Sequence, residues 1–137
     1  MKTPIPLFRE GVACGFPSPA QDYVEKRLSL DDYCIRHPES TYLVRAEGES
    51  MIDAGIQNGD LMVVESFADP QHGDIVIAAI DGEFTCKRLQ LRPSPALLPA
   101  NAAYRTIPLT GDVDTVVFGV VRHCVHSFGG VRRVCPG

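Results

Sequence analysis

The sequence has no excess of basic residues, no long apolar run and no glycine-rich phosphate loop. Its 137 residues contain 13 Lys and Arg against 17 Asp and Glu, which gives a net charge of −4. That balance excludes the basic field of an autonomous DNA-binding protein, so we expect any action at DNA to go through a protein partner. No apolar run approaches the length of a membrane span, and no nucleotide-binding motif is present. We therefore expect neither a membrane partner nor a cofactor.

Cysteine pairs of the CxxC type are also missing, although the chain has five cysteines. They are Cys14, Cys34, Cys86, Cys124 and Cys135. An odd number without CxxC spacing indicates free thiols, and the N-terminus is too short and too rich in proline to be a signal peptide. We therefore expect a protein of the reducing cytoplasm, without a disulfide framework.

Proline and glycine punctuate residues 1–22. Because proline fixes φ and keeps the preceding residue extended, we predict a flexible, extended N-terminal arm here and one β-rich domain over residues 23–137. Such an arm is either a mobile terminus or a peptide that lies in a protease cleft as an added strand. The small residues Ala13-Cys14-Gly15 favour the second interpretation, because they let a peptide bond enter a narrow site.

From residue 41 onward the pattern is that of a mostly β protein. The predicted strands are 41–47, 60–65, 74–80, 83–91, 95–99 and 115–127. Asp81-Gly82 is typical of a two-residue hairpin, and Gly119 indicates a bulge or a close approach within the last strand. Ahead of these strands, a serine cap and Pro38 predict one short helix at residues 30–36.

Ser50 and Lys87 form the candidate catalytic pair. Ser50 follows Gly48-Glu49 where a predicted strand meets a turn, and successive backbone N–H groups in a turn can bind an oxyanion. Burial lowers the pKa of a lysine, and a neutral lysine can take the proton from a serine hydroxyl without a histidine. Ordinary roles stay open, because most such serines are turn residues and most strand lysines are solvated. Alternation along 83–91 does not decide whether Lys87 is buried, since neither face is purely apolar.

Two other kinds of site compete with this pair. His123, Cys124 and His126 suggest a metal site, but on a strand only two of the three side chains converge, and structural zinc needs four ligands. Ordinary strand residues are favoured, so no metal is expected. A Ser-His-Asp triad is not excluded by spacing, but no histidine has a sequence context that favours it over Lys87, and His37 and His72 stand in polar turns.

Several short segments occur in an informative order and with informative spacing. They are Cys14-Gly15-Phe16-Pro17-Ser18-Pro19-Ala20, Gly48-Glu49-Ser50-Met51-Ile52-Asp53, Asn58-Gly59-Asp60, His72-Gly73-Asp74-Ile75-Val76-Ile77-Ala78-Ala79, Asp81-Gly82-Glu83-Phe84-Thr85, Lys87-Arg88-Leu89 and Phe118-Gly119-Val120-Val121. Together they resemble the LexA/UmuD family of self-cleaving serine peptidases (S24), and the resemblance extends over most of the chain, from about residue 14 to about residue 125. A set of ordered motifs is far more specific than any one of them.

The resemblance implies roles for individual residues. Ser50 matches the nucleophile, Lys87 the general base, and Cys14-Gly15 the bond that the protein cuts in itself. The oxyanion hole would use the backbone N–H groups of Glu49 and Ser50. The implied fold is a compact antiparallel β domain of the LexA C-terminal (β-clip) type, with the extended arm and one short helix.

The resemblance also implies partners. Family members of this kind are homodimers that cut themselves when stimulated by the RecA filament on single-stranded DNA, and the trimmed dimer joins a UmuC-type Y-family polymerase in SOS mutagenesis. Only 13 residues precede Cys14, too few for the helix-turn-helix domain of the family's repressors, so we expect no sequence-specific DNA binding. Two alternatives stay open: a binding module with vestigial cleavage, and a signal-peptidase-like enzyme that acts on other proteins.

Overall fold

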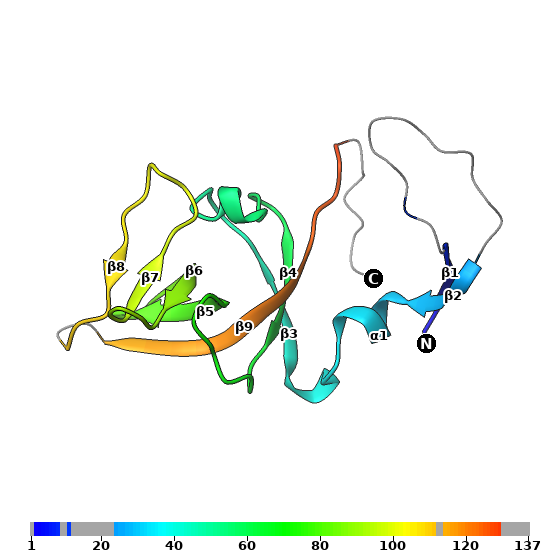
Figure 1. Cartoon of the computed structure of the whole chain (residues 1–137), viewed down its shortest axis with the longest axis horizontal. Helices are drawn as coiled ribbons and strands as arrows, with labels where there is room; N and C mark the ends of the chain where they lie inside the picture. The colour runs from blue at the N-terminus through cyan, green and yellow to red at the C-terminus, as the bar shows by residue number, and fades with distance from the viewer. Residues whose placement is uncertain (1, 9–10, 12–23, 112–113, 130–137) are drawn as a thin grey trace. The chain divides into compact units, whose positions relative to one another are not determined.

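The computed structural model describes residues 2–8, 11, 24–111 and 114–129 (Figure 1). By its internal contacts the chain divides into two units, residues 1–36 and 37–137, which are described here one at a time. The division of function between an arm over residues 1–22 and a domain over residues 23–137 stays a prediction, because most of the arm lies outside the described residues. None of the described helices has the length and apolar character that crossing a membrane would need.

The first unit contains two strands and the helix. β1 (Pro4–Phe8) pairs antiparallel with β2 (Val24–Ser29), and α1 (Leu30–Cys34) follows directly. Ser29 caps α1, since its side chain accepts a hydrogen bond from the N–H of Asp32 at 3.5 Å. The short helix is thereby confirmed, whereas the two strands β1 and β2 were not predicted. Prolines are tolerated in β1 because it is an edge strand whose side chains are all exposed.

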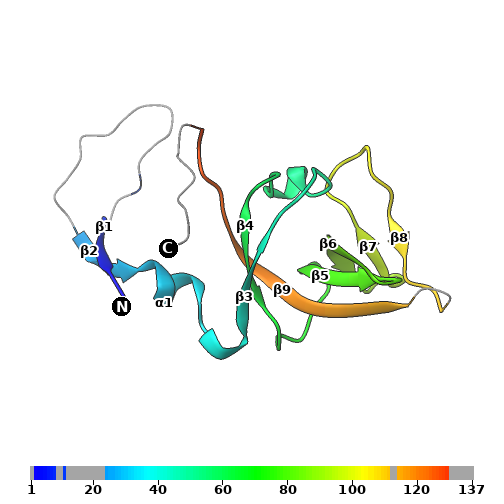
Figure 2. The same cartoon turned by 180° about the vertical axis from the view of Figure 1, so that it is seen from behind.

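The second unit is a seven-stranded antiparallel sheet in the order β3-β4-β9-β5-β6-β7-β8 (Figures 1 and 2). Its elements are η1 (Pro38–Ser40), β3 (Thr41–Arg45), η2 (Ile52–Ala54), β4 (Leu61–Glu65), β5 (Ile75–Ile80), β6 (Glu83–Gln90), β7 (Ala96–Leu98), β8 (Ile107–Pro108) and β9 (Thr115–Val125). The six predicted strands are confirmed, with ends that differ by one or two residues, and the mostly β antiparallel fold is confirmed with them. Only the two-residue β8 was missed in this unit.

β9 joins the two halves of the sheet, as the two opposite views show (Figures 1 and 2). Its first half pairs with β5 and its second half with β4. At Gly119 the strand passes so close to β4 that a Cβ atom there would lie 2.6 Å from Val64 Cγ1 and 2.9 Å from the Glu65 carbonyl oxygen. The predicted close approach at Gly119 is therefore confirmed, and only glycine fits without displacing β4.

The core lies on both sides of the hairpin formed by β5 and β6. One cluster contains Ala46, Met51, Ile56, Met62, Val64 and Ile77. The other contains Val76, Ala78, Leu89, Leu97 and Val120. Consecutive residues of β5, Val76 and Ile77, belong to different clusters because strand side chains alternate. Both faces of this hairpin are thus covered, so a residue on either face can be buried.

The hairpin itself fixes where Lys87 lies. Asp81 and Gly82 have φ values of 50° and 88°, the left-handed conformations that a tight two-residue hairpin requires. The turn sets the register of the two strands, in which Val76 lies opposite Lys87. The predicted hairpin is confirmed, and it brings the middle of β6 beside the segment that follows β3.

Candidate active site

Ser50 lies in a turn that three backbone hydrogen bonds and two amide side chains hold in place. The N–H of Ala100 donates to the Ser50 carbonyl at 2.7 Å. Asn101 Nδ2 donates to the Glu49 carbonyl at 2.8 Å, and the N–H of Gly48 donates to Asn58 Oδ1 at 2.8 Å. The turn continues into η2, where the N–H of Ile52 bonds the Glu49 carbonyl at 3.2 Å and the N–H of residue 53 bonds the Ala100 carbonyl at 2.8 Å. The loop after β7 therefore clamps the serine backbone.

Lys87 is buried, with 8% of its surface exposed. Its Nζ lies 3.0 Å from Ser50 Oγ, 2.7 Å from Thr85 Oγ1 and 3.2 Å from the Cys86 carbonyl oxygen. All three partners are neutral oxygen atoms, and no carboxylate is among the hydrogen-bond partners of Lys87 in the described part of the chain. The structure thus brings the serine and the lysine together and answers the question of burial that the alternation left open.

The surroundings favour the uncharged form of Lys87. Burial lowers the pKa of Lys87 below its usual value, because the ammonium loses water that no anion replaces. The Cys86 thiol acts in the opposite direction only when it is ionised, and burial raises the pKa of Cys86 to about 11. At neutral pH that thiol is uncharged, so desolvation decides the direction of the lysine shift.

The pair opens into a cleft of about 400 Å³. Apolar residues of the first core cluster line much of it, and Ser50, Thr85 and Lys87 supply polar atoms. Phe84 and Tyr104 also line the cleft. A cavity of this size with a few convergent polar groups is typical of a ligand or substrate site.

The two backbone N–H groups of the predicted oxyanion hole are available to bind a ligand. Within the described residues, the N–H groups of Glu49 and Ser50 donate no hydrogen bond. Their carbonyls face the loop at residues 100–101 instead. Backbone donors that are held rigidly and left unbonded are suited to an oxyanion. The assignment of Glu49 and Ser50 to this role stays a prediction.

The other candidate residues serve different contacts. His72 Nδ1 accepts a hydrogen bond from the N–H of Leu91 at 2.9 Å, and His126 Nδ1 lies 2.6 Å from Asp60 Oδ1. Cys124 Sγ donates to Asp60 Oδ2 at 3.1 Å. No histidine within the described residues contacts Ser50 or Lys87 by a hydrogen bond. No cluster there of three His, Cys, Asp or Glu residues could hold a metal ion.

Three residues that contact the serine turn or the lysine were not predicted from the sequence: Thr85, Asn58 and Asn101. Thr85 could have been found, because alternation puts it on the same face of β6 as Lys87. Asn58 and Asn101 lie in loops, and nothing in the sequence pattern connects them with the serine turn. The predicted cleavage residues, Cys14 and Gly15, lie outside the described part of the chain.

A serine hydroxyl bonded to a buried lysine in an apolar cleft defines a class of hydrolase that works without histidine. The chain belongs to the peptidase S24-like family, whose sequence model matches residues 6–122. That membership makes it a serine peptidase of the self-cleaving, LexA/UmuD-like type.

Named relatives cover nearly the whole chain. Protein ImpA of Salmonella typhimurium is 54% identical over 129 residues, which is 93% of this chain and 87% of ImpA. Protein SamA of Salmonella typhimurium is 53% identical over 122 residues, 89% of this chain and 85% of SamA. Protein MucA of Escherichia coli is 45% identical over 120 residues, 87% of this chain and 82% of MucA. The similarity therefore extends to almost the full length of these relatives.

Proposed function

We propose that the protein is a UmuD-like accessory subunit of an error-prone translesion DNA polymerase, and that it matures by cutting its own Cys14–Gly15 bond. Ser50 is the nucleophile and Lys87 the general base. The observation that carries the proposal is the contact of 3.0 Å between Lys87 Nζ and Ser50 Oγ. It is made by a buried lysine that has no anionic partner among the described residues.

The hydrogen bonds around Lys87 suit a neutral amine. Two N–H groups of the amine donate to Thr85 Oγ1 and to the Cys86 carbonyl, which leaves the nitrogen lone pair directed at the Ser50 hydroxyl. In this state Ser50 donates its proton to Lys87 Nζ. Because burial lowers the pKa of Lys87, this state is accessible at a lower pH than for an exposed lysine.

The chemistry then follows in two steps. Ser50 Oγ attacks the carbonyl carbon of Cys14, and the oxyanion takes hydrogen bonds from the N–H groups of Glu49 and Ser50, each worth about 3 to 4 kcal/mol in comparable sites. The C–N bond breaks, and Lys87 returns the proton to the amine of Gly15, the new N-terminus. Water, deprotonated by Lys87, then hydrolyses the ester between Ser50 and Cys14 and restores the hydroxyl.

The cleft lies where an arm could enter it as an added strand. β3 is an edge of the sheet within the described residues, and Val44 and Arg45 of β3 line the cleft. Proteases commonly bind substrates in this extended form. A RecA filament on single-stranded DNA would supply no catalytic group. It would stabilise the docked arm, which is a population shift.

The remaining parts of the proposal rest on the similarity to the LexA/UmuD type. They are a homodimer in the cytoplasm, stimulation by RecA, and assembly of the trimmed dimer with a UmuC-type polymerase. The negative net charge of −4 agrees with action at DNA through partners.

The test is the intact mass of the purified protein after incubation with RecA, single-stranded DNA and a nucleotide. We expect a fragment that begins at Gly15, absent from Ser50→Ala and from Lys87→Ala. Fragments of another mass, or the same fragment from either variant, would contradict the assignment. Cleavage that is lost in Ser50→Ala while mutagenesis in cells persists would favour the binding-module alternative.

Without RecA, the rate of self-cleavage should rise with pH. Below the pKa of Lys87 only the neutral fraction reacts, so the rate should increase about tenfold per pH unit and level off above that pKa. Because burial lowers this pKa, the plateau should begin below pH 10.5, the ordinary lysine value. A rate that does not change between neutral and alkaline pH would argue against Lys87 as the base.

A further inference from the structure

Two exposed phenylalanines lie together, and one of them, Phe84, lines the cleft. Phe84 of β6 is 70% exposed and Phe118 of β9 is 41% exposed. Their ring centroids are 5.1 Å apart at an interplanar angle of 52°, the tilted arrangement that aromatic rings favour. We call this pair the aromatic shelf. Because both rings are substantially exposed, the fold alone does not account for them.

The aromatic shelf is held firmly although it is exposed. Tyr42 Oη donates a hydrogen bond to the Phe118 carbonyl at 3.1 Å. The next residue, Gly119, passes against β4 with no room for a Cβ atom. Phe84 follows the tight Asp81-Gly82 turn in a strand that pairs on one side with β5. The two rings are therefore presented on rigid strands, as a preformed binding surface requires.

The aromatic shelf is continuous with the candidate active site. Phe84 lines the same cleft as Ser50 and Lys87. It precedes Lys87 by three residues of β6, a separation of about 10 Å along a strand. An extended peptide places its second residue beyond a scissile bond about 7 Å away, and its side chain adds further reach. The two lengths are comparable, and Phe84 lines the cleft that the peptide would enter.

The sequence beside the predicted scissile bond supplies a matching side chain. Residues 11–17 read Gly-Val-Ala-Cys-Gly-Phe-Pro, and Phe16 is the only aromatic residue among them. We propose that the aromatic shelf is the subsite that receives the Phe16 side chain and thereby holds the Cys14–Gly15 bond over Ser50. The proposal rests on the proposed function, because it takes that bond as the one cleaved. It assigns an aromatic specificity to the position two residues beyond the bond.

A contact at Phe16 would compensate for the conformational freedom of Gly15. The residues at the bond itself are small and offer little surface to grip, and glycine leaves the backbone free to adopt many conformations. An anchor on the next residue restricts those conformations, so it raises the fraction of arms in the reactive pose. The occupant is the Phe16 side chain of the N-terminal arm.

The experiment measures self-cleavage of the full chain at alkaline pH without RecA, by intact mass. Phe84→Ala and Phe16→Ala should each slow cleavage about tenfold. The Phe16→Ala, Phe84→Ala double variant should be within about twofold of either single variant, because both changes remove one contact. Phe118→Ala should slow cleavage in the same direction, and Phe16→Tyr should retain the rate because it keeps the ring.

Phe67→Ala is the matched control. Phe67 is 87% exposed and does not line the cleft, so its loss should leave the rate unchanged. Because Phe84 and Phe118 are exposed, their replacement should also leave thermal unfolding and sedimentation of the protein unchanged. Those two measurements show whether a slower variant is misfolded or dissociated.

Three results would overturn the proposal. In the first, the fold-reductions in cleavage rate from Phe16→Ala and Phe84→Ala multiply in the double variant. In the second, Phe84→Ala cleaves itself at the normal rate. In the third, Phe84→Ala changes the oligomeric state while cleavage stays intact. The last result would assign the aromatic shelf to an interface between protein copies. Failure of the proposed function looks different: the Gly15 fragment then does not form in the unaltered protein, or forms without Ser50 or Lys87.

Discussion

Two buried ionisable groups of the sheet unit, Lys87 and Asp60, have surroundings of opposite character. Lys87 is bonded only to neutral oxygen atoms, and burial lowers its pKa. Asp60 is 2% exposed and receives hydrogen bonds from the N–H of Gln57, from Cys124 and from His126. Desolvation opposes its charge, but these three donors outweigh it, so the pKa of Asp60 lies below its ordinary value.

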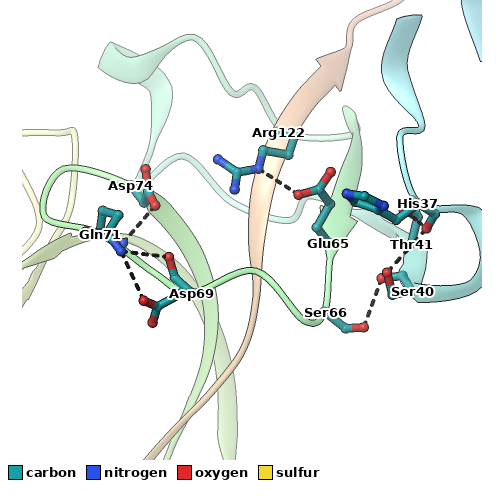
Figure 3. A network of polar contacts seen from close by, with 9 residues as sticks. All are labelled: His37, Ser40, Thr41, Glu65, Ser66, Asp69, Gln71, Asp74 and Arg122. Atoms are coloured by element: carbon teal, nitrogen blue, oxygen red, sulfur yellow. Dashed lines mark hydrogen bonds and ion pairs between the residues drawn. The ribbon is translucent and has the colours of Figure 1, made fainter. Parts of the chain in front are cut away.

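The same direction of shift has opposite meanings for a base and an acid. A lowered pKa favours the neutral form of Lys87 and the charged form of Asp60. The fold therefore stabilises the charge of Asp60 and disfavours that of Lys87. Glu65, which accepts a hydrogen bond from Arg122 at 3.0 Å, is also paired with a donor (Figure 3). A buried ionisable group without an opposite charge is the one that points to chemistry.

Lys87→Met should give the largest effect and separate activity from stability. Self-cleavage should fall by at least about a thousandfold, because the proposed general base is lost. The free energy of unfolding at neutral pH should stay equal or rise by about 1 kcal/mol, since folding no longer desolvates an ammonium. The measurements are intact mass with time and urea unfolding.

The pH dependence tests this interpretation of the stability. Below its lowered folded-state pKa, unaltered Lys87 is protonated in both states, and its burial penalises the folded state. As pH rises past its lowered folded-state pKa, folded Lys87 loses its proton first, and the penalty fades. The advantage of Lys87→Met should therefore shrink at alkaline pH. A large loss of stability at neutral pH would show that Lys87 supports the fold instead.

Asp60→Asn should have the opposite effect on the fold. The amide cannot accept all three hydrogen bonds, so the free energy of unfolding should fall by about 2 to 3 kcal/mol at neutral pH. The contribution of Asp60 is fully present above its unfolded pKa of about 3.9. It is lost as pH falls through the lower folded-state pKa, so the two proteins should converge in stability there. Equal stability at pH 7 would refute a structural role for this cluster.

The sequence predicted the strands well because their patterns are local. Alternation is a property of each strand alone, and the Asp81-Gly82 turn joins the neighbouring strands β5 and β6. A close approach at Gly119 follows from the residue type. β1 was not predicted because all its side chains are exposed, so its sequence has no alternation of apolar and polar residues. Burial of Lys87 could not be read from β6, because both faces of the hairpin are covered by clusters that come from distant segments.

In the candidate site, too, the residues marked by local motifs were predicted and the contacts between distant segments were not. Ser50 and Lys87 were predicted from motifs, and the structure adds their distance and burial. Asn101 was not predicted, because its contact with the Glu49 carbonyl joins residues 52 positions apart. Likewise, nothing in the sequence pattern connects Asp60 with His126 and Cys124. The structure places it in a buried cluster with His126 and Cys124, a contact that only the tertiary fold creates.

Asn101→Ala should slow self-cleavage about tenfold, or about 1.4 kcal/mol in the transition state, because the Glu49–Ser50 backbone loses one of its clamps. Stability should change by less than about 1 kcal/mol, since the amide lies at the surface. Gln71→Ala is a suitable control. Its amide bonds Asp69 in an exposed turn (Figure 3), and its loss should leave cleavage unaltered. Unchanged cleavage in Asn101→Ala would mean that the other clamps suffice.

Thr85→Val should have the smallest effect and sharpen the description of Lys87. Thr85 Oγ1 accepts a hydrogen bond from Lys87 Nζ at 2.7 Å, which stabilises the ammonium more than the amine and also orients it. Removing the oxygen should lower the apparent pKa of cleavage and reduce the plateau rate by about threefold. Thr85→Ser, which keeps the hydroxyl, should restore both. A lower plateau with an unchanged pH profile would indicate that Thr85 acts only through packing, and a higher apparent pKa would show that Lys87 had gained water.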